Sequence, residues 1–251
     1  MKKYLCRPFH MPDYEIISDC PEFIESLYLQ YGDYISDTVC ENTYSINITK
    51  NTENPLLVLD SVLFDTTVYD DSIIPLHGAA VEYNGCAYIF LAPTTSGKTT
   101  LISYLIHNGM GYITEDCVLV DKQTFGIYPY PCPIHLRDGG IEVLKKHGIV
   151  ISVIKTLDTH AGTRYIYTPD NCVENLTPIG GIFFIERNET DNSMKDMPTS
   201  ESIMELMKSS ITVYQPSAEH IRLMSELSQI GCKRLIYKDM EYVREIIAEG
   251  T

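Results

Sequence analysis

Positive charge is scarce in this sequence. Its 251 residues hold 19 Lys and Arg against 34 Asp and Glu, which gives a formal net charge of −15. A chain this acidic repels a phosphate backbone, so general nucleic-acid binding is not expected. The excess of acidic side chains is largest in residues 1–74, where 13 acidic and four basic side chains give a formal net charge of −9. Because 44% of the residues are hydrophobic, the chain can still bury a core, which excludes global disorder.

Long apolar runs are also missing. No stretch approaches the roughly 18 consecutive apolar residues that a membrane span requires. The basic start of the chain resembles that of a signal peptide, but Arg7, His10, Asp13 and Glu15 interrupt the apolar segment that would have to follow. We therefore expect neither a membrane span nor secretion, and we expect the protein in the cytoplasm.

Cysteines close together in the sequence are also missing. The eight cysteines lie far apart and no CxxC motif occurs, so no ligand pair has the spacing of a zinc site. A chain of this length does not need a disulfide framework. We expect most of these residues to be small buried apolar side chains in a reducing compartment. They are Cys6, Cys20, Cys40, Cys86, Cys117, Cys132, Cys172 and Cys232.

No internal repeat or low-complexity tract divides the chain, but its character changes near residue 74. Residues 1–73 mix short apolar runs with acidic turns, which predicts a small α+β appendage. Pro21 opens a predicted helix to Tyr31 that Gly32 stops. Residues 44–49 alternate with period two, as in a half-buried strand, and the apolar run 56–59 predicts a short buried strand.

Residues 74–251 have the alternating strands and helices of an α/β domain. Asn84-Gly85 lies between the apolar runs 79–83 and 86–91, a combination that predicts a β-hairpin. Apolar residues at i,i+4 spacing predict a helix over 97–107, which Asn108-Gly109 ends. The other predicted elements are a strand over 112–120, an extended segment 129–133, a strand over 177–185, a loop over 188–198, helices over 199–209 and 217–230, a strand over 233–237, and a helix over 240–248.

The most informative stretch joins the predicted strand 86–91 to the helix 97–107. Residues 92–99 match the phosphate-binding pattern G-x-x-x-x-G-K-[ST], except that Ala92 replaces the first glycine. The backbone N–H groups of such a loop and the helix N-terminus attract an anion. Lys98 adds a charge for the β- and γ-phosphates, and the Thr99 hydroxyl can bind Mg²⁺. The predicted nucleotide-binding residues are Pro93, Thr94, Thr95, Ser96, Gly97, Lys98, Thr99 and Thr100.

Two adjacent carboxylates interrupt the apolar run 112–120. Glu115 and Asp116 are costly to bury unless they are paired, hydrogen-bonded or bound to a metal. Beside Lys98 and a bound cation, such a carboxylate can hold Mg²⁺ or accept a hydroxyl proton. Because neighbouring strand residues point to opposite faces, one acid would face the phosphates and the other would brace the site. Solvated acids at a strand end are the alternative.

Two further residues are candidates for the same site. His77 precedes the predicted hairpin, where the strand order would bring it beside the phosphate loop, although a lone histidine is more often a core or surface residue. Arg137 follows the proline-rich segment, and an arginine there can clamp developing phosphoryl charge. A surface cation is an equal alternative for Arg137.

The order of these motifs resembles the C-terminal catalytic domain of the HPr serine kinase/phosphorylase family over residues 74–190. In that family a His-Gly strand, a P-loop and an acidic-pair strand follow one another in the same way. The stretches 130–137 and 178–184 are similar to the HPr-kinase-related peptide or protein serine kinases of peptide biosynthetic clusters. The sequence departs from the HPr kinases in its less glycine-rich loop, in Glu115 where the family has Asp, and in lacking their Arg-Gly-Leu-Gly motif.

The resemblance implies an α/β fold: a P-loop HPr-kinase-like (PEP-carboxykinase-like) catalytic domain with the small N-terminal appendage. It implies that Lys98 and Thr99 bind phosphate and Mg²⁺, that Glu115 or Asp116 is the catalytic carboxylate, with Asp116 also a metal ligand, and that His77 supports that carboxylate.

The sequence therefore predicts a kinase that uses ATP and Mg²⁺ to phosphorylate a serine hydroxyl of a peptide or protein acceptor. One alternative is a kinase for a small-molecule hydroxyl in the same pocket. Another is a non-catalytic, nucleotide-gated binding module, against which the acidic pair argues because binding alone does not require it. The sequence is compatible with a homo-oligomer. Either Glu115 or Asp116 could be the base.

Overall fold

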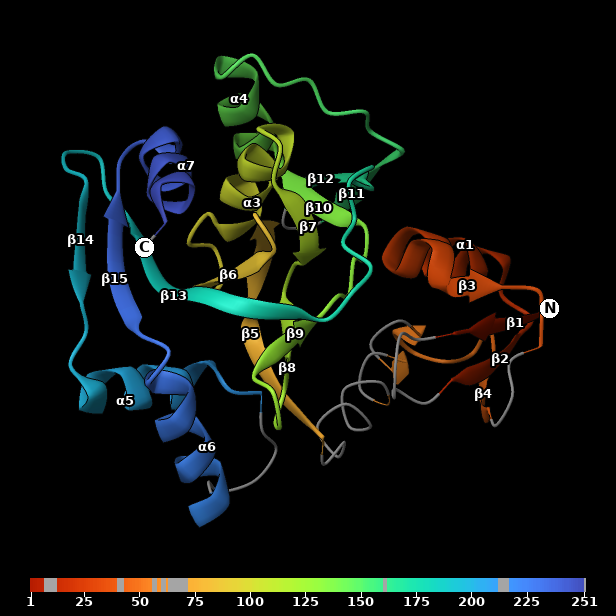
Figure 1. The fold of residues 1–251 in the computed structure, drawn as a ribbon. Coiled ribbons are helices and arrows are strands. Elements are labelled where there is room, and N and C mark those ends of the chain that lie inside the picture. Colours follow the sequence, from red (N-terminus) through yellow and green to blue (C-terminus); the bar gives the residue numbers. More distant parts are fainter. Residues whose placement is uncertain are drawn as a thin grey trace. The chain divides into compact units, whose positions relative to one another are not determined.

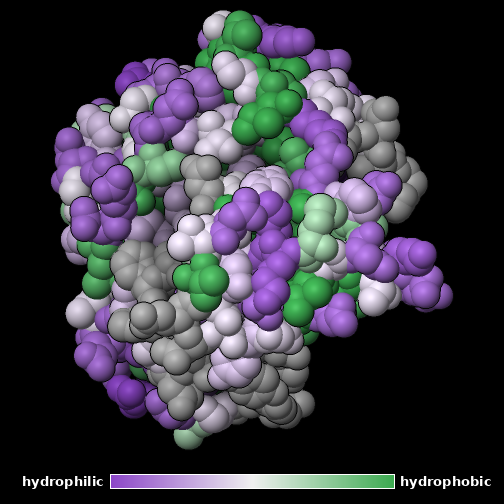
Figure 2. All heavy atoms as spheres, turned by 90° about the vertical axis from the view of Figure 1, so that its right-hand side faces the viewer, coloured by the Kyte–Doolittle hydropathy of each residue, from purple (hydrophilic) through white to green (hydrophobic). Residues whose placement is uncertain are grey.

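The chain is described by a computed structural model that covers residues 1–6, 13–39, 43–55, 58–59, 62, 72–159, 162–211 and 217–250. It folds into two compact units, Met1–Asp71 and Ser72–Thr251 (Figure 1). No helix in these ranges is long and apolar enough to cross a membrane. Hydrophilic residues cover much of the face shown in Figure 2, with small apolar groups between them.

The first unit contains a four-stranded sheet and the helix α1 (Pro21–Tyr31). The sheet has the order β3-β1-β2-β4, and α1 buries Phe23, Ile24 and Leu27. Gly32 follows α1 with φ 55°, a left-handed conformation that favours glycine, so the predicted helix and its stop are confirmed. The other elements are β1 (Lys2–Leu5), β2 (Tyr14–Ser18), η1 (Gly32–Tyr34), β3 (Ile35–Ser36) and β4 (Tyr44–Ile48).

Two predictions for this unit need correction. Val58 and Leu59 are helical, not the end of a strand, and the Val58 N–H donates to the Asn54 carbonyl with helical i−4 spacing. The remaining residues of that predicted strand, 56–57, lie outside the described ranges. Cys6 is bonded in a disulfide, which we did not predict from its isolated position in the sequence.

The second unit contains an eight-stranded mixed sheet with the order β14-β15-β13-β6-β5-β8-β9, and β7 pairs with β5 beside β8. Neighbours β15, β13 and β6 run parallel, whereas β5 is antiparallel to β6. The strands are β5 (Ile73–Tyr83), β6 (Cys86–Leu91), β7 (Gly111–Thr114), β8 (Cys117–Asp121), β9 (Gly126–Tyr128), β13 (Thr177–Arg187), β14 (Ser193–Asp196) and β15 (Cys232–Tyr237).

Helices cover both faces of this sheet. Along β5, Ala79 and Val81 join an apolar cluster with α3 (Lys98–His107), α4 (Asp138–Lys146) and α7 (Met240–Glu249). The alternate residues Leu76 and Ala80 join a second cluster with α5 (Thr199–Ser209) and α6 (Ala218–Ser228). Because successive strand residues point to opposite faces, the two clusters define a three-layer α/β architecture.

The β5–β6 hairpin forms as predicted. Its turn residues Asn84 and Gly85 have φ values of 52° and 78°, as the tight two-residue turn requires. The predicted helix 97–107 is also confirmed, and the chain leaves α3 through Gly109, whose φ is 97°. These two elements place the loop 92–97 at the carboxyl end of β6.

Three segments differ from the sequence-based expectation. The predicted strand 112–120 is broken into β7 and β8 at Glu115 and Asp116, where Asp116 adopts φ 72°. The predicted loop 188–198 contains β14, which pairs with β15 at the sheet edge. A second sheet, with the order β10-β12-β11, was not predicted; its strands are β10 (Ile134–Arg137), β11 (Lys155–Thr159) and β12 (Gly162–Tyr167).

Gly78 is required where β5 and β6 approach each other. An added Cβ would lie 2.5 Å from Leu91 Cδ2 and 2.9 Å from the Phe90 carbonyl oxygen. We therefore expect Gly78→Ala to lower the free energy of unfolding by about 1–3 kcal/mol through overpacking, measured by urea denaturation. Gly139→Ala is the control, because its added Cβ meets no atom within 4 Å and alanine favours a helix. Equal stability of wild type and Gly78→Ala would contradict this close approach.

Candidate functional site

The loop between β6 and α3 exposes backbone N–H groups at a helix start. Thr95 and Gly97 have φ values of 70° and 94°, and the Ser96 N–H donates to the Pro93 carbonyl at 3.3 Å. No side chain caps the N-terminus of α3, which begins at Lys98. The first N–H groups of a helix have no intrahelical acceptor, and they lie at the positive end of its dipole. The loop thus presents donors and positive potential to an anion.

The side chains of this loop also fit a phosphate group. The Ser96 hydroxyl oxygen is buried without a hydrogen-bond partner in the structure. A buried hydroxyl without a partner loses the hydrogen bonds that water would supply, and a phosphate oxygen would accept from it. Pro93, Thr94 and Thr95 are exposed beside it. The backbone N–H groups of the loop and the Ser96 hydroxyl are therefore both suited to a phosphate oxygen.

Lys98 turns its ammonium group into the loop. The side chain is buried, and Nζ donates to the Ala92 carbonyl at 2.6 Å and to the Pro93 carbonyl at 3.2 Å. Nζ also lies 3.3 Å from Nε2 of His77. Burial lowers the pKa of Lys98, while the negative charges of Asp116 and Glu115 oppose the shift. The cation is therefore held at the loop by its acidic neighbours.

The same contacts define the tautomer of His77. An ammonium group has only protons to give, so Nε2 of His77 accepts from Lys98. Nδ1 then carries the ring proton and donates to the backbone carbonyl of Asp116 at 3.2 Å. His77 thus joins the phosphate loop to the break between β7 and β8.

The strand break brings the acidic pair to the loop in an unequal way. The Asp116 carbonyl accepts from the Gly78 N–H at 3.3 Å in addition to His77, and the Asp116 side chain is exposed. The Glu115 carboxylate is half-buried and accepts a short hydrogen bond from the Thr99 hydroxyl on the first turn of α3. Glu115 therefore contacts the first turn of α3 with its side chain, whereas Asp116 contacts β5 with its backbone.

The pKa of the Glu115 carboxyl is raised from 4.5 to about 7. Burial is the largest cause, and the neighbouring Asp116 charge adds to it. The Thr99 hydrogen bond and the charges of Lys98 and Arg164 act in the opposite direction. A carboxyl with such a pKa can exchange a proton near neutral pH, as general acid–base chemistry requires.

The structure brings five of the predicted site residues into one chain of contacts. Thr99 meets Glu115, and Lys98 meets His77, which meets the Asp116 backbone; the bonds between residues 98 and 99 and between residues 115 and 116 join the two sets. Within the described ranges, no group of three or more His, Cys, Asp or Glu residues is arranged to hold a metal ion. Mg²⁺ commonly takes only one or two protein ligands and completes its shell with water and phosphate. Thr99 with a neighbouring carboxylate fits that chemistry.

Arg137 lies outside this chain of contacts. It is exposed at the start of α4, and in the β10–β12 pairing it lies directly opposite Arg164. Like charges directly opposite each other in a sheet are unfavourable. Arg164 is within electrostatic reach of Glu115 and was missed in the sequence, because no local pattern indicates which strand pairs with β10.

Thr100, the last of the predicted loop residues, faces α4. A Cβ added at Gly140 would lie 2.8 Å from the Thr100 hydroxyl oxygen, so glycine is needed for this helix to approach the loop. The first turn of α4 therefore forms one boundary of the site.

Comparison with known proteins gives matches among solved structures only. No protein-family model matches the chain, and no curated protein matches it. Among solved structures, the chain is similar to the Hpr(Ser) kinase/phosphatase from Coxiella burnetii, at 7% identity. The alignment covers 70% of this chain and 94% of that one, with a TM-score of 0.36. A similarity at this level does not define an activity, which has to be argued from the site.

Glu115 should make folding stability depend on pH. Because its pKa is raised on folding, the protonated carboxyl favours the folded state below pH 4.5, and this contribution is lost as pH rises through about 7. We therefore expect the difference in free energy of unfolding, wild type minus Glu115→Gln, to decrease as the pH rises from 4.5 to about 7. Urea denaturation of both proteins across the range measures the difference. A constant difference would contradict the raised pKa.

Proposed function

We propose that the protein is a kinase that transfers the γ-phosphoryl group of ATP to a serine hydroxyl of a peptide or protein. The observation that carries this proposal is the contact of Glu115 with Thr99. A carboxyl with a pKa near neutrality touches the first turn of a helix that begins with a phosphate-binding loop. A loop that only bound nucleotide would not need a proton acceptor there.

In the proposed complex the loop N–H groups and Ser96 bind the phosphate oxygens. Lys98 exchanges its bonds to the Ala92 and Pro93 carbonyls for phosphate oxygens, where its charge offsets that of the β- and γ-phosphates. When bound, Mg²⁺ supplies further neutralisation of phosphate charge, and Thr99 with Glu115 or Asp116 would hold it. These residues position the phosphoryl group and stabilise the charge that develops on it.

The transfer step exchanges one bond to phosphorus for another. The serine oxygen forms a bond to the γ-phosphorus while the bond from that phosphorus to the bridging oxygen of ADP breaks, and ADP leaves. The serine proton moves to a carboxylate, for which Glu115 and Asp116 are the two candidates. His77 holds the Asp116 backbone and accepts from Lys98, so we assign it a positioning role.

A protein or peptide acceptor is proposed for reasons of charge. The acidic composition of residues 1–73 suits a basic peptide, whereas a small charged metabolite would need cations of its own. Arg137 and Arg164 would serve either the transferring phosphoryl group or an anionic acceptor. We place the activity in the cytoplasm, where ATP is abundant.

Lys98→Ala should abolish both tight ATP binding and turnover, because it removes the buried cation at the loop. A fluorescent ATP analogue measures binding, and ADP release in the presence of serine-containing peptides measures turnover. The control is Lys146→Ala, which removes an exposed lysine at the end of α4. Unchanged affinity and turnover in Lys98→Ala would exclude a phosphate site at this loop.

Glu115→Gln and Asp116→Asn distinguish a kinase from a binding module. Loss of the general base should lower the transfer rate by about 10²–10⁴-fold, while ATP affinity changes far less. The variant with the larger loss identifies the base. Glu142→Gln, at an exposed position of α4, is the matched control and should keep full activity. Tight ATP binding without any transfer by the wild type would favour a nucleotide-gated module instead.

A further inference from the structure

A cavity adjoins the phosphate loop on the side away from His77 and Glu115. Its enclosed volume is about 30 Å³, and with the open solvent at its mouth the space is about 300 Å³. Gly97 and Thr100 of the loop and α3 form one wall, so the cavity is continuous with the site for phosphate. We call it the β15 crevice; its lining is Gly97, Thr100, Val143, His147, Arg187, Tyr237, Lys238 and Met240.

The β15 crevice lies at the carboxyl ends of three adjacent parallel strands. The phosphate loop follows β6, Arg187 is the last residue of β13, and Tyr237 is the last residue of β15. These strands are hydrogen-bonded neighbours in the order β15-β13-β6. In open α/β sheets, ligands bind in the crevice outside the carboxyl ends of the strands. The phosphate loop occupies only the first of these three strand ends.

The chemistry of the lining suits a polar ligand with a flat apolar part. Arg187, Lys238 and His147 bring nitrogen donors to the rim, and none of the lining residues is acidic. Val143 and Met240 supply apolar side chains. The hydroxyl of Tyr237 approaches the loop, since a Cβ at Gly97 would lie 3.6 Å from it. Donors beside apolar contacts are what a ribose and a heterocyclic base require.

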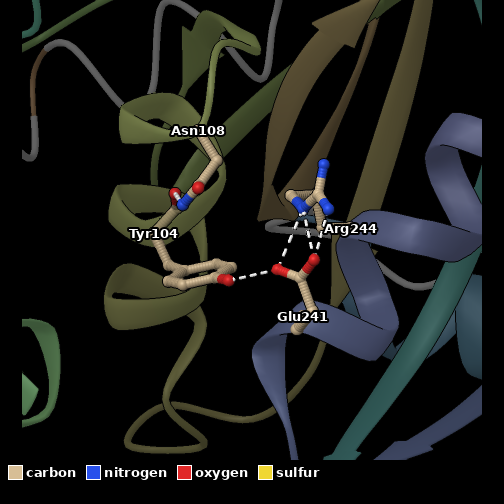
Figure 3. Close-up of polar contacts among 4 residues, drawn as sticks. All are labelled: Tyr104, Asn108, Glu241 and Arg244. Carbon is tan, nitrogen blue, oxygen red and sulfur yellow. Dashed lines mark hydrogen bonds and ion pairs between the residues drawn. The ribbon is translucent and has the colours of Figure 1, made fainter. Parts of the chain in front are cut away.

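One wall is fixed to the loop helix by a polar network. Figure 3 shows Tyr104 of α3 pointing toward Glu241 of α7, which also faces Arg244. The Tyr104 hydroxyl donates to Glu241 at 2.5 Å, and Nε of Arg244 lies 2.9 Å from both carboxylate oxygens. His147 packs edge-on against Tyr104, with ring centroids 5.1 Å apart. The network therefore holds α3 and α7 together beside the crevice, and His147 of the lining packs on α3.

We propose that the β15 crevice holds the ribose and base of the nucleotide whose phosphates bind the loop. This inference rests on the proposed nucleotide site. When the phosphates are bound at the loop, the attached nucleoside has to extend from the loop on one side. The side of Glu115 and His77 must stay open for the acceptor hydroxyl. Gly97 and Thr100 connect the loop directly to the crevice on the opposite side.

The test compares ATP with inorganic tripolyphosphate, which has the phosphates but no nucleoside. Val143→Trp fills the crevice and should weaken Mg²⁺–ATP binding by about tenfold or more while leaving tripolyphosphate binding unchanged. Val150→Trp is the matched control, because Val150 is 81% exposed and does not line the crevice. Isothermal titration measures both ligands with wild type and both variants.

The outcomes separate this inference from the proposed function. Selective loss of ATP affinity in Val143→Trp supports the nucleoside subsite. Equal weakening of both ligands, or no weakening of either, overturns it while the loop remains a phosphate site. If the wild type binds neither ligand, the proposed function is wrong and this inference fails with it.

A second measurement does not depend on a folded variant. An ATP analogue with a photoreactive azide on its base is bound to the wild-type protein and irradiated, and the labelled peptide is identified by mass spectrometry. We expect the label on Val143–His147 or Tyr237–Met240, with protection by excess ATP. ATP-protected label confined to other segments would overturn the proposal.

Discussion

The carbonyl oxygen of Asp116 is the point on which the site depends. Two donors from β5, the Gly78 N–H and the His77 ring, converge on it. They stabilise a left-handed aspartate that ends β7 and restarts the chain as β8. A left-handed non-glycine residue is a cost that the surrounding contacts have to offset. The result is a Glu115 carboxylate at the first turn of α3 and not on one face of a regular strand.

The antiparallel and the parallel strands of the sheet position different parts of the site. The antiparallel strands β5, β7 and β8 bring His77 and the acidic pair to the loop, where a hydroxyl would lose its proton. The parallel strands β6, β13 and β15 end in the loop and in the crevice beside it. In the proposed function, the loop between them would therefore join proton transfer on one side to nucleoside binding on the other.

Elements with local signals could be predicted from the sequence, and those set by long-range pairing could not. Asn84-Gly85 specified the hairpin, and the glycine-lysine start and Asn108-Gly109 end specified α3. The break at Asp116 was missed because apolar residues continue on both sides of it, so the pattern indicates one strand. Arg164 depends on the pairing of β10 with β12, which no local pattern records. His77, Lys98, Thr99 and the acidic pair thus gather as predicted, whereas Arg137 does not, and of the two acids only Glu115 meets Thr99 directly.

The direction of the hydrogen bonds at His77 determines when its Nε2 atom can accept from another group. Lys98 donates to Nε2, so that nitrogen of the imidazole cannot accept from any other group. Under the proposed function Lys98 would turn to a phosphate and release that lone pair, while Nδ1 keeps its bond to the Asp116 backbone. The imidazole would then offer a single acceptor of fixed direction to a water or a hydroxyl. This one atom would link occupancy of the loop to the acceptor hydroxyl without movement of the strands.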